Sequence, residues 1–142
     1  SGAVGIDVSA FSSREKEFVK SLFSPIANVV FVEENKLNAV TGVSGSAPAY
    51  FYLFVKSIIE AGVNQGLSYG EAKNLAVSTM IGSGKMIENN PDKDIDELIK
   101  AVCSKGGTTI EAVNVLKNGG LDKLVDDAIK ACVKRSFELE NC

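Results

Sequence analysis

The sequence predicts a mainly α fold, a helical bundle preceded by a short βαβ segment. Strand-like runs of β-branched residues occur only within the first 33 residues, whereas apolar residues recur at helical spacing through the remainder. Four expected helix starts have the Ser/Thr/Asp-x-x-Glu spacing of a capping box. With 142 residues, 45% of them hydrophobic, the chain is long enough to bury a core of its own.

The first 33 residues are expected to form two strands around one helix. Residues 3–8 and 29–32 are short runs suited to strands. Between them, Ser12 and Glu15 mark a helix start, and Pro25 ends the helix near Phe23. Two strands and one helix cannot cover both faces of a sheet, so this segment is interpreted as the last βαβ unit of an α/β domain. Because the chain opens at Ser1, it is also expected to be a piece of a longer protein.

The rest of the chain is expected to be helical. A helix over about 48–66 is apolar nearly all round, which predicts burial on most sides, either centrally or in a subunit interface. A second helix, over about 68–89, contains Gly82-Ser83-Gly84, and we expect a partner helix to approach closely there. Asp94 and Glu97 cap a short helix. Two more helices follow, over 109–117 and from 121 on, and helices this apolar suggest that a second subunit completes the core.

Charge and composition exclude several functional classes. The net charge is only −3 with both signs interspersed, so no basic face indicates nucleic acid or an anionic membrane. Histidine is absent, which excludes Ser-His and Cys-His nucleophile pairs and histidine-based metal sites. No apolar run has the length of a membrane span, and no signal peptide is recognisable. Cys103, Cys132 and Cys142 lack Cys-x-x-Cys spacing and are expected to be reduced thiols in a cytoplasmic protein.

The segment 103–110 is the main candidate for a ligand site. Gly106 and Gly107 permit positive φ and close approach of a ligand to the backbone. Thr108 is expected to be the N-cap of the following helix, in a capping box with Glu111. A helix that begins there directs free N–H groups and the positive end of its dipole at the loop, an environment suited to phosphate or carboxylate. The alternative is that the two glycines only turn one helix into the next.

Two segments, each followed by an expected helix, form a recognisable combination: Val43-Ser44-Gly45-Ser46-Ala47-Pro48-Ala49-Tyr50 and Ser104-Lys105-Gly106-Gly107-Thr108-Thr109. Together they resemble pyrroline-5-carboxylate reductase. The segments 81–86 and 134–139 fit the same pattern, so the resemblance extends over essentially the whole chain. It implies that residues 1–33 are a remnant of the nucleotide-binding Rossmann domain and that residues 34–142 are the helical dimerisation and substrate-binding domain.

The resemblance implies reduction of Δ1-pyrroline-5-carboxylate to L-proline with NADPH or NADH, an oxidoreductase reaction of proline biosynthesis. It further implies a homodimer that can assemble further. No G-x-G-x-x-G fingerprint is present, so we expect this polypeptide alone to lack reductase activity. The residues that distinguish NADPH from NADH are expected in the nucleotide-binding domain.

Site residues transfer from the family by motif. The substrate-binding residues implied by the resemblance are Ser104, Gly106, Gly107, Thr108 and Thr109. Because an N-cap hydroxyl is used by its own helix, Thr109 rather than Thr108 is expected to make the catalytic contact with the imine nitrogen. The segment Ser44, Gly45 and Ser46 is the expected cofactor contact, although a plain helix cap explains it equally well.

The sequence departs from the family pattern at two positions, and two alternative functions stay open. Lys105 stands where many relatives have proline, and Ala47 stands where glycine is usual. Lys105 loosens the loop but places a cation beside the expected carboxylate. One alternative is the helical domain of another Rossmann-type dehydrogenase, of the hydroxyacid or prephenate type, for which Lys85 is the residue to consider. The other is a helical dimerisation module without enzymatic activity.

Overall fold

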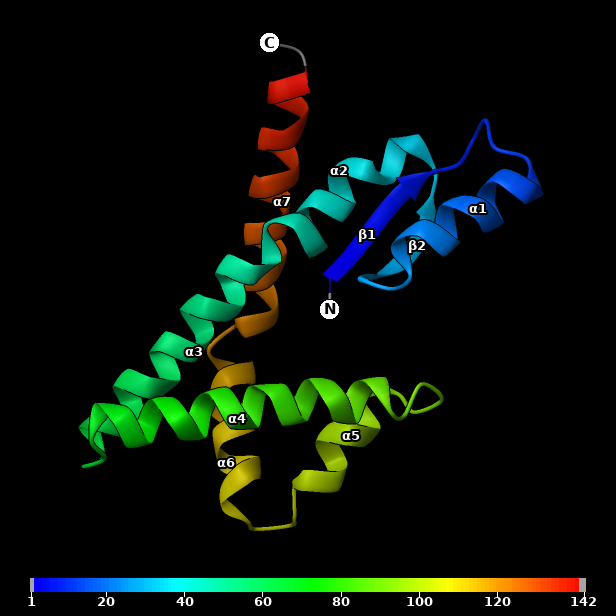
Figure 1. The fold of residues 1–142 in the computed structure, drawn as a ribbon. Coiled ribbons are helices and arrows are strands. Elements are labelled where there is room, and N and C mark those ends of the chain that lie inside the picture. Colours follow the sequence, from blue (N-terminus) through cyan, green and yellow to red (C-terminus); the bar gives the residue numbers. More distant parts are fainter. Residues whose placement is uncertain (1, 141–142) are drawn as a thin grey trace. The chain divides into compact units, whose positions relative to one another are not determined.

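The computed structural model describes residues 2–140 and has a βαβ segment followed by helices (Figure 1). The predicted fold class is therefore confirmed. A short 3₁₀ turn, Glu34–Lys36, precedes the first helix after the sheet, and a π-helical turn that we call η2, Thr41–Gly45, follows that helix. The strands and helices are β1 (Gly2–Asp7), α1 (Ser13–Phe23), β2 (Ala27–Val32), α2 (Leu37–Val40), α3 (Ala47–Asn64), α4 (Tyr69–Glu88), α5 (Ile95–Val102), α6 (Thr108–Asn118) and α7 (Leu121–Glu140).

The chain divides into two compact units, which are described separately below. The first comprises the residues up to Ala49 together with those from Val125 on, and the second comprises Tyr50–Leu124. The first unit therefore contains the βαβ segment, α2, η2 and most of α7, whereas the second contains most of α3 together with α4, α5 and α6. The sequence-based boundary between residues 33 and 34 stays a prediction.

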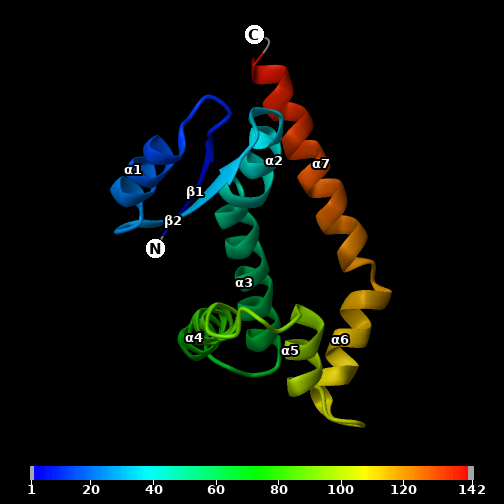
Figure 2. The same ribbon diagram turned by 90° about the vertical axis from the view of Figure 1, so that its right-hand side faces the viewer.

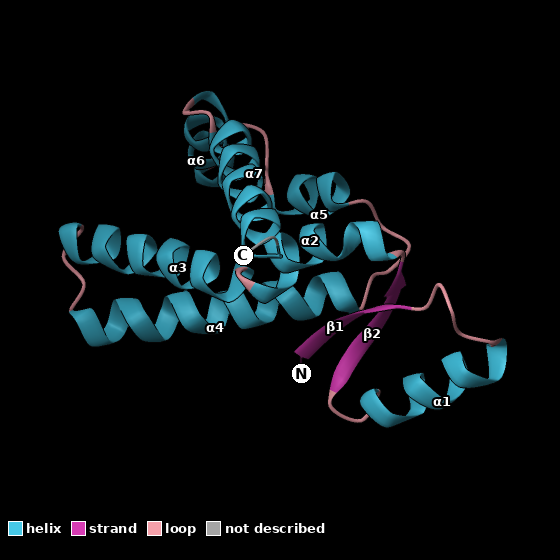
Figure 3. Cartoon of the chain, turned by 90° about the horizontal axis from the view of Figure 1, so that it is seen from above, coloured by secondary structure: helices cyan, strands magenta, loops and turns pink. Residues whose placement is uncertain are grey.

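In the first unit, β1 and β2 pair in parallel, as a βαβ connection requires (Figure 3). The register runs from Gly2 opposite Ala27 to Asp7 opposite Val32. The crossover helix α1 begins with a complete capping box between Ser12 and Glu15, as predicted.

Helix α2 approaches β1 closely at one glycine. A Cβ atom added to Gly5 would lie 2.6 Å from Cγ1 of Val40 and 3.0 Å from its Cγ2. Glycine is the residue that permits this approach, because any larger side chain would overlap the valine methyl groups.

The second unit has its core between α3 and α4, which diverge from their connecting turn (Figure 1) and bury a shared cluster. Gly66, with φ of 99°, turns the chain between the two helices, and Ser68 and Glu71 form the predicted capping box of α4. Gly62 lets the helices approach closely, since an added Cβ would lie 3.3 Å from Cβ of Ala72. The buried cluster consists of Val55, Ile59, Ala72 and Ala76, with Val77 packed against it.

Helix α3 is buried on one side only in this chain. Central burial of α3 was expected as one possibility, and it is wrong: Phe51 is 59% exposed, Tyr52 70% and Leu53 66%. No other element among the described residues of this chain approaches Gly82 or Gly84, since a Cβ atom added at either position meets nothing within 4 Å beyond the helix's own neighbouring backbone. Close approach by a helix of a second subunit stays a prediction. The other expectation for α3, burial in a subunit interface, stays a prediction.

Candidate functional site

The segment between α5 and α6 contains the predicted ligand loop (Figure 2). Asp94 caps α5 through the predicted box with Glu97. At the end of α5, Cys103 leaves the helical conformation with φ of −100° and ψ of 92°. Cys103 is partly buried, and the next three residues are exposed.

Ser104 to Gly107 form a tight turn. The N–H of Gly107 donates a hydrogen bond to the carbonyl oxygen of Ser104 at 3.0 Å, and Gly106 has φ of 72°. A bond from the fourth residue to the first, with positive φ at the third, is the arrangement of a type II turn. Gly106 is required for its conformation, because φ in this region strains any residue with a Cβ atom.

Gly107 is required for a different reason, the space that it leaves. A Cβ atom at Gly107 would collide with the hydroxyl oxygen of Ser104 and would lie 3.2 Å from the Ser104 carbonyl oxygen. The turn therefore holds the Ser104 side chain directly against the backbone that enters α6.

Helix α6 begins one residue earlier than expected, and this corrects the predicted capping box. Gly107 is the N-cap, with φ of −81° and ψ of 168°, and no side-chain cap bond is made. The physical reason is the turn, which brings the chain into helical conformation directly after Gly107. Thr108 and Thr109 are thus the first two residues of the helix, so the reason for preferring Thr109 over Thr108 no longer holds.

The start of α6 therefore lacks the side-chain acceptor that α1, α4 and α5 have at theirs. The first N–H groups of a helix have no partner within the helix, and here no N-cap side chain supplies one. Around these groups lie the exposed residues Ser104, Lys105, Thr108 and Thr109. Hydroxyls, a lysine and the positive end of a helix dipole form an environment that suits a small carboxylate.

The second predicted contact, Ser44, Gly45 and Ser46, lies in the first unit. It was expected in a loop of small residues before a helix, and this expectation is wrong, because η2 continues α2 as a π-helical turn. The N–H of Ser46 donates to the carbonyl oxygen of Thr41 at 2.9 Å, five residues back. Single π-helical turns are often found at functional sites. Ser44 and Ser46 are partly buried, and Gly45 is exposed.

Helix α7 makes contacts with this turn that the sequence analysis did not predict. The Sγ atom of Cys132 donates a hydrogen bond to Oγ of Ser46 at 3.3 Å, and Oγ of Ser136 donates to Oδ1 of Asn38. The spacing of these residues on α7 indicates one face of a helix, but nothing in the sequence names their partners. Cys103 is partly buried, and Cys142 lies outside the described residues.

Within residues 2–140, no group of three or more cysteine, aspartate or glutamate side chains could hold a metal ion. No helix in the same range is long and apolar enough to cross a bilayer.

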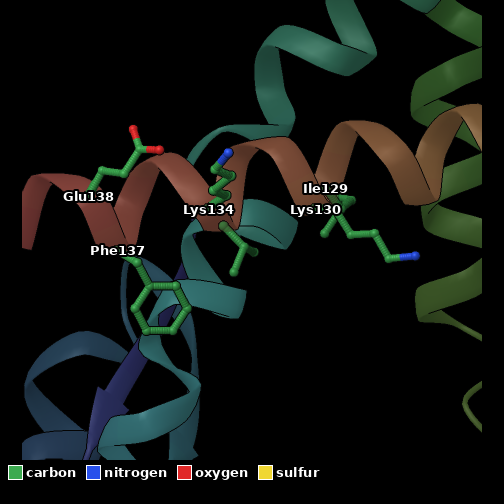
Figure 4. A pocket seen from close by; sticks show the side chains of 6 residues that line it. Ile129, Lys130, Lys134, Phe137 and Glu138 are labelled. Carbon is green, nitrogen blue, oxygen red and sulfur yellow. The ribbon is translucent and has the colours of Figure 1, made fainter.

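An open groove of about 700 Å³ runs along α7. Phe137 extends from one side of the helix, and the carboxylate of Glu138 lies on the opposite side (Figure 4). The groove lining is almost entirely apolar, so it offers few polar groups to orient a small ligand.

Comparison with known proteins identifies relatives over nearly the whole chain. The family model described as pyrroline-5-carboxylate reductase dimerisation matches residues 34–139. The pyrroline-5-carboxylate reductase of Mycobacterium tuberculosis is 39% identical over an alignment 142 positions long, gaps included, and the alignment covers 89% of this chain and 48% of the relative. That of Synechocystis is 40% identical over 120 residues, covering 84% of this chain and 45% of the relative. The chain thus spans about half the length of the curated relatives it matches.

Solved structures agree with this result. A pyrroline-5-carboxylate reductase from Coxiella burnetii superposes with a TM-score of 0.92 at 30% identity, over 96% of this chain and 51% of that one. A pyrroline carboxylate reductase from Plasmodium falciparum with NADP bound superposes with a TM-score of 0.80 at 30% identity, over 95% of this chain and 52% of that one.

Proposed function

This chain belongs to the pyrroline-5-carboxylate reductase family, and from this premise we propose that it forms the substrate-binding and dimerisation part of such an enzyme. The reaction is reduction of Δ1-pyrroline-5-carboxylate to L-proline with NADPH or NADH, the last step of proline biosynthesis. The proposal places the protein in the cytoplasm and assigns residues 1–33 to the nucleotide-binding domain and 34–142 to the helical domain.

The start of α6 is the observation that supports the substrate site most directly. Gly107 is an N-cap without a side chain, so the N–H groups of the first turn are available to a ligand carboxylate. In the proposal, these N–H groups and the hydroxyls of Ser104 and Thr108 bind the carboxylate of the pyrroline ring. Gly106 shapes the turn through its positive φ, and Gly107 through its close contact with the Ser104 side chain.

Thr109 remains the proposed catalytic contact with the ring nitrogen, now on the family resemblance alone. A threonine hydroxyl is too weak an acid to protonate an imine unaided, so the substrate binds already protonated or receives its proton through Thr109 from water. We expect Thr109→Val to lower kcat roughly 10²-fold or more, the effect of losing one positioned donor. Thr108→Val is the matched control and should raise KM for the substrate with little change in kcat. Equal kinetics for the two variants would contradict the assignment.

Ser44, Gly45 and Ser46 are proposed to contact the nicotinamide end of the dinucleotide. Residues 41–47 contain hydroxyls and small residues but no cationic side chain. Uncharged hydroxyl groups suit the neutral carboxamide of the nicotinamide, whereas the charged phosphates of the dinucleotide favour cationic side chains. An added Cβ at Gly45 would have its nearest neighbour at 3.9 Å, so the surface there is open to a flat ring. When bound, the dinucleotide supplies the hydride, and the residues of this chain orient the two reactants.

We propose that the active protein is a homodimer. The exposed aromatic face of α3 and the open surface at Gly82 and Gly84 on α4 support this, because large exposed apolar patches on helices mark contact surfaces. Sedimentation should give a dimer at micromolar concentration, and Phe51→Ser should shift it towards monomer. A stable monomer of the unaltered protein would contradict the proposal.

The polypeptide of these 142 residues is proposed to be inactive alone. It contains no glycine-rich dinucleotide fingerprint, and it spans about half the length of its curated relatives. The experiment is an NADPH oxidation assay with Δ1-pyrroline-5-carboxylate, run on this polypeptide and on the full-length protein. Turnover only by the latter supports the proposal, and turnover by the 142-residue polypeptide contradicts it.

A binding experiment separates the reductase from the alternative functions. Thermal denaturation of the 142-residue polypeptide should show stabilisation by L-proline that Ser104→Ala weakens. A dimerisation module without a substrate site would show no response. A dehydrogenase of the hydroxyacid or prephenate type would respond to its own substrate and not to proline, and Lys85→Ala would then abolish its activity.

A further inference from the structure

Helix α7 contacts the segment from α2 to the start of α3 at three successive places. The Ser136 hydroxyl forms a hydrogen bond with Asn38. The methyl groups of Ile129 and Val133 pack against Gly42. The Cys132 thiol forms a hydrogen bond with the Ser46 hydroxyl. The four α7 residues recur at the spacing of one helical face. All of these residues belong to the first compact unit. One face of α7 therefore contacts η2 at Gly42 and the residues on both sides of it, Asn38 and Ser46.

Gly42 sets how closely the turn approaches α7. It is buried, and an added Cβ atom would lie 3.2 Å from Cγ2 of Val133 and 3.3 Å from Cγ2 of Ile129. Both distances are tighter than ordinary van der Waals contact between carbon atoms. A larger residue would push the turn away from the helix, so glycine at this position keeps the backbone of η2 against α7.

Asn38 fixes the beginning of the same segment. It is only 6% exposed, and its Oδ1 accepts a hydrogen bond from the hydroxyl of Ser136, 98 residues later in the sequence. A buried amide is costly to leave without a partner, so this bond selects one relative position of α2 and α7.

Cys132 holds the Ser46 side chain in place. Sγ of Cys132 lies at hydrogen-bond distance from Oγ of Ser46, 3.3 Å away. A hydroxyl has two acceptor lone pairs as well as one donor proton, so Ser46 keeps hydrogen-bonding capacity for a ligand while Cys132 occupies one side of its oxygen.

We infer that Cys132 and Ser136 are positioning residues, through which α7 orients the Ser44–Ser46 segment towards the nicotinamide carboxamide of the cofactor. The inference rests on the proposed cofactor contact of this segment. It adds that cofactor affinity depends on a helix that contributes no residue to that contact, while substrate affinity depends on the loop before α6. The two affinities are therefore separable by mutation.

The kinetic test uses the full-length protein with Ser136→Ala and Cys132→Ala. Each variant should raise KM for NADPH about tenfold, with kcat and KM for Δ1-pyrroline-5-carboxylate changed less than about twofold. Ser136→Thr and Cys132→Ser keep a donor and should restore most of the lost affinity. The matched control is Ser57→Ala, whose hydroxyl donates to the Leu53 carbonyl oxygen within α3 at 3.0 Å. Unchanged KM for NADPH in both alanine variants would overturn the inference, as would an equal rise in the control.

A second measurement does not depend on reductase activity. In a Cys103→Ser/Cys142→Ser background, alkylation of Cys132 should be several-fold faster in Ser136→Ala than in the parent, and NADPH should slow it in the parent only. Equal rates in the two proteins would overturn the inference. Gly42→Ala, which crowds Val133 and Ile129 and leaves Ser136 unaltered, should also speed alkylation and serves the same comparison if Ser136→Ala fails to fold. If the parent shows no reductase activity, the proposed function fails, while the alkylation rates still decide whether α7 holds the turn.

Discussion

Gly107 lies so close to Ser104 that a methyl group on its α-carbon would collide with the serine hydroxyl oxygen. The relationship joins two proposed substrate residues, because Gly107 is the N-cap of α6 and also accommodates the Ser104 side chain. The observed shape of the loop therefore requires glycine at position 107, because any side chain there would displace the Ser104 hydroxyl.

Gly107→Ala should displace the Ser104 hydroxyl and weaken substrate binding. We expect KM for Δ1-pyrroline-5-carboxylate to rise about tenfold or more, the effect of losing a positioned hydrogen-bond donor. Steady-state kinetics of the full-length protein measure it. The matched control is Gly70→Ala, where an added Cβ meets nothing within 4 Å. Wild-type KM in Gly107→Ala would show that Ser104 does not bind the substrate from this position.

Lys105 occupies the second position of the type II turn, where proline is favoured by its fixed φ. Lys105→Pro should stabilise the protein by about 0.4–1 kcal/mol, because proline restricts the unfolded chain in a conformation that the turn already has. Chemical denaturation of the 142-residue polypeptide measures this. Destabilisation would mean that the turn needs a different φ at this residue.

Lys105→Gln separates the charge of the lysine from the stiffness of the turn. An exposed cation near a carboxylate contributes modestly and is screened by salt, so KM for the substrate should rise about two- to fivefold at low ionic strength and less at high. A rise that is independent of salt would contradict an electrostatic role for Lys105.

The sequence predicted the elements well where the determining interactions are local. The capping boxes of Ser12, Ser68 and Asp94 join residues three apart, and each is present in the structure. The same reasoning was wrong at Thr108, because the turn closed by Ser104 and Gly107 competes for the same residues and has glycine at the N-cap. Spacing alone does not reveal which of two local motifs forms.

Contacts between residues far apart in the chain could not be predicted from the sequence pattern. The pairs Asn38–Ser136 and Ser46–Cys132 are 98 and 86 residues apart, and no periodicity within either segment identifies its partner. Local features alone indicated Ser104–Thr109 as a ligand loop, and the resemblance to a known family assigned roles to the residues of Ser44–Ser46 and of Ser104–Thr109. It did not supply the π-helical form of the first segment or the helix that covers it.

The capping box of α4 predicts a loss of stability in acid. The pKa of Glu71 lies below its ordinary value of 4.5, first because the Ser68 hydroxyl donates to the carboxylate and then because the Ser68 backbone N–H does. A depressed folded pKa means that the stabilisation is complete above 4.5 and is lost as the pH falls through the lower folded value. Ser68→Ala removes one donor, so its stability should depend less on pH in this range. Thermal denaturation from neutral pH to about pH 3 measures the difference, and parallel curves for the two proteins would contradict it.

Gly5→Ala should destabilise the first unit through Val40. The new Cβ atom would lie 2.6 Å from Cγ1 of Val40, so strand and helix must separate or the valine must move. Overpacking of this kind costs about 1–3 kcal/mol. Val40→Ala removes both methyl groups that obstruct the new side chain. In that background Gly5→Ala should be neutral or stabilising, because alanine restricts the unfolded chain more than glycine does. Gly2→Ala, whose nearest atom would be 3.7 Å away, is the control and should cost little. Equal costs of Gly5→Ala in the two backgrounds, measured by chemical denaturation, would show that its effect does not pass through Val40.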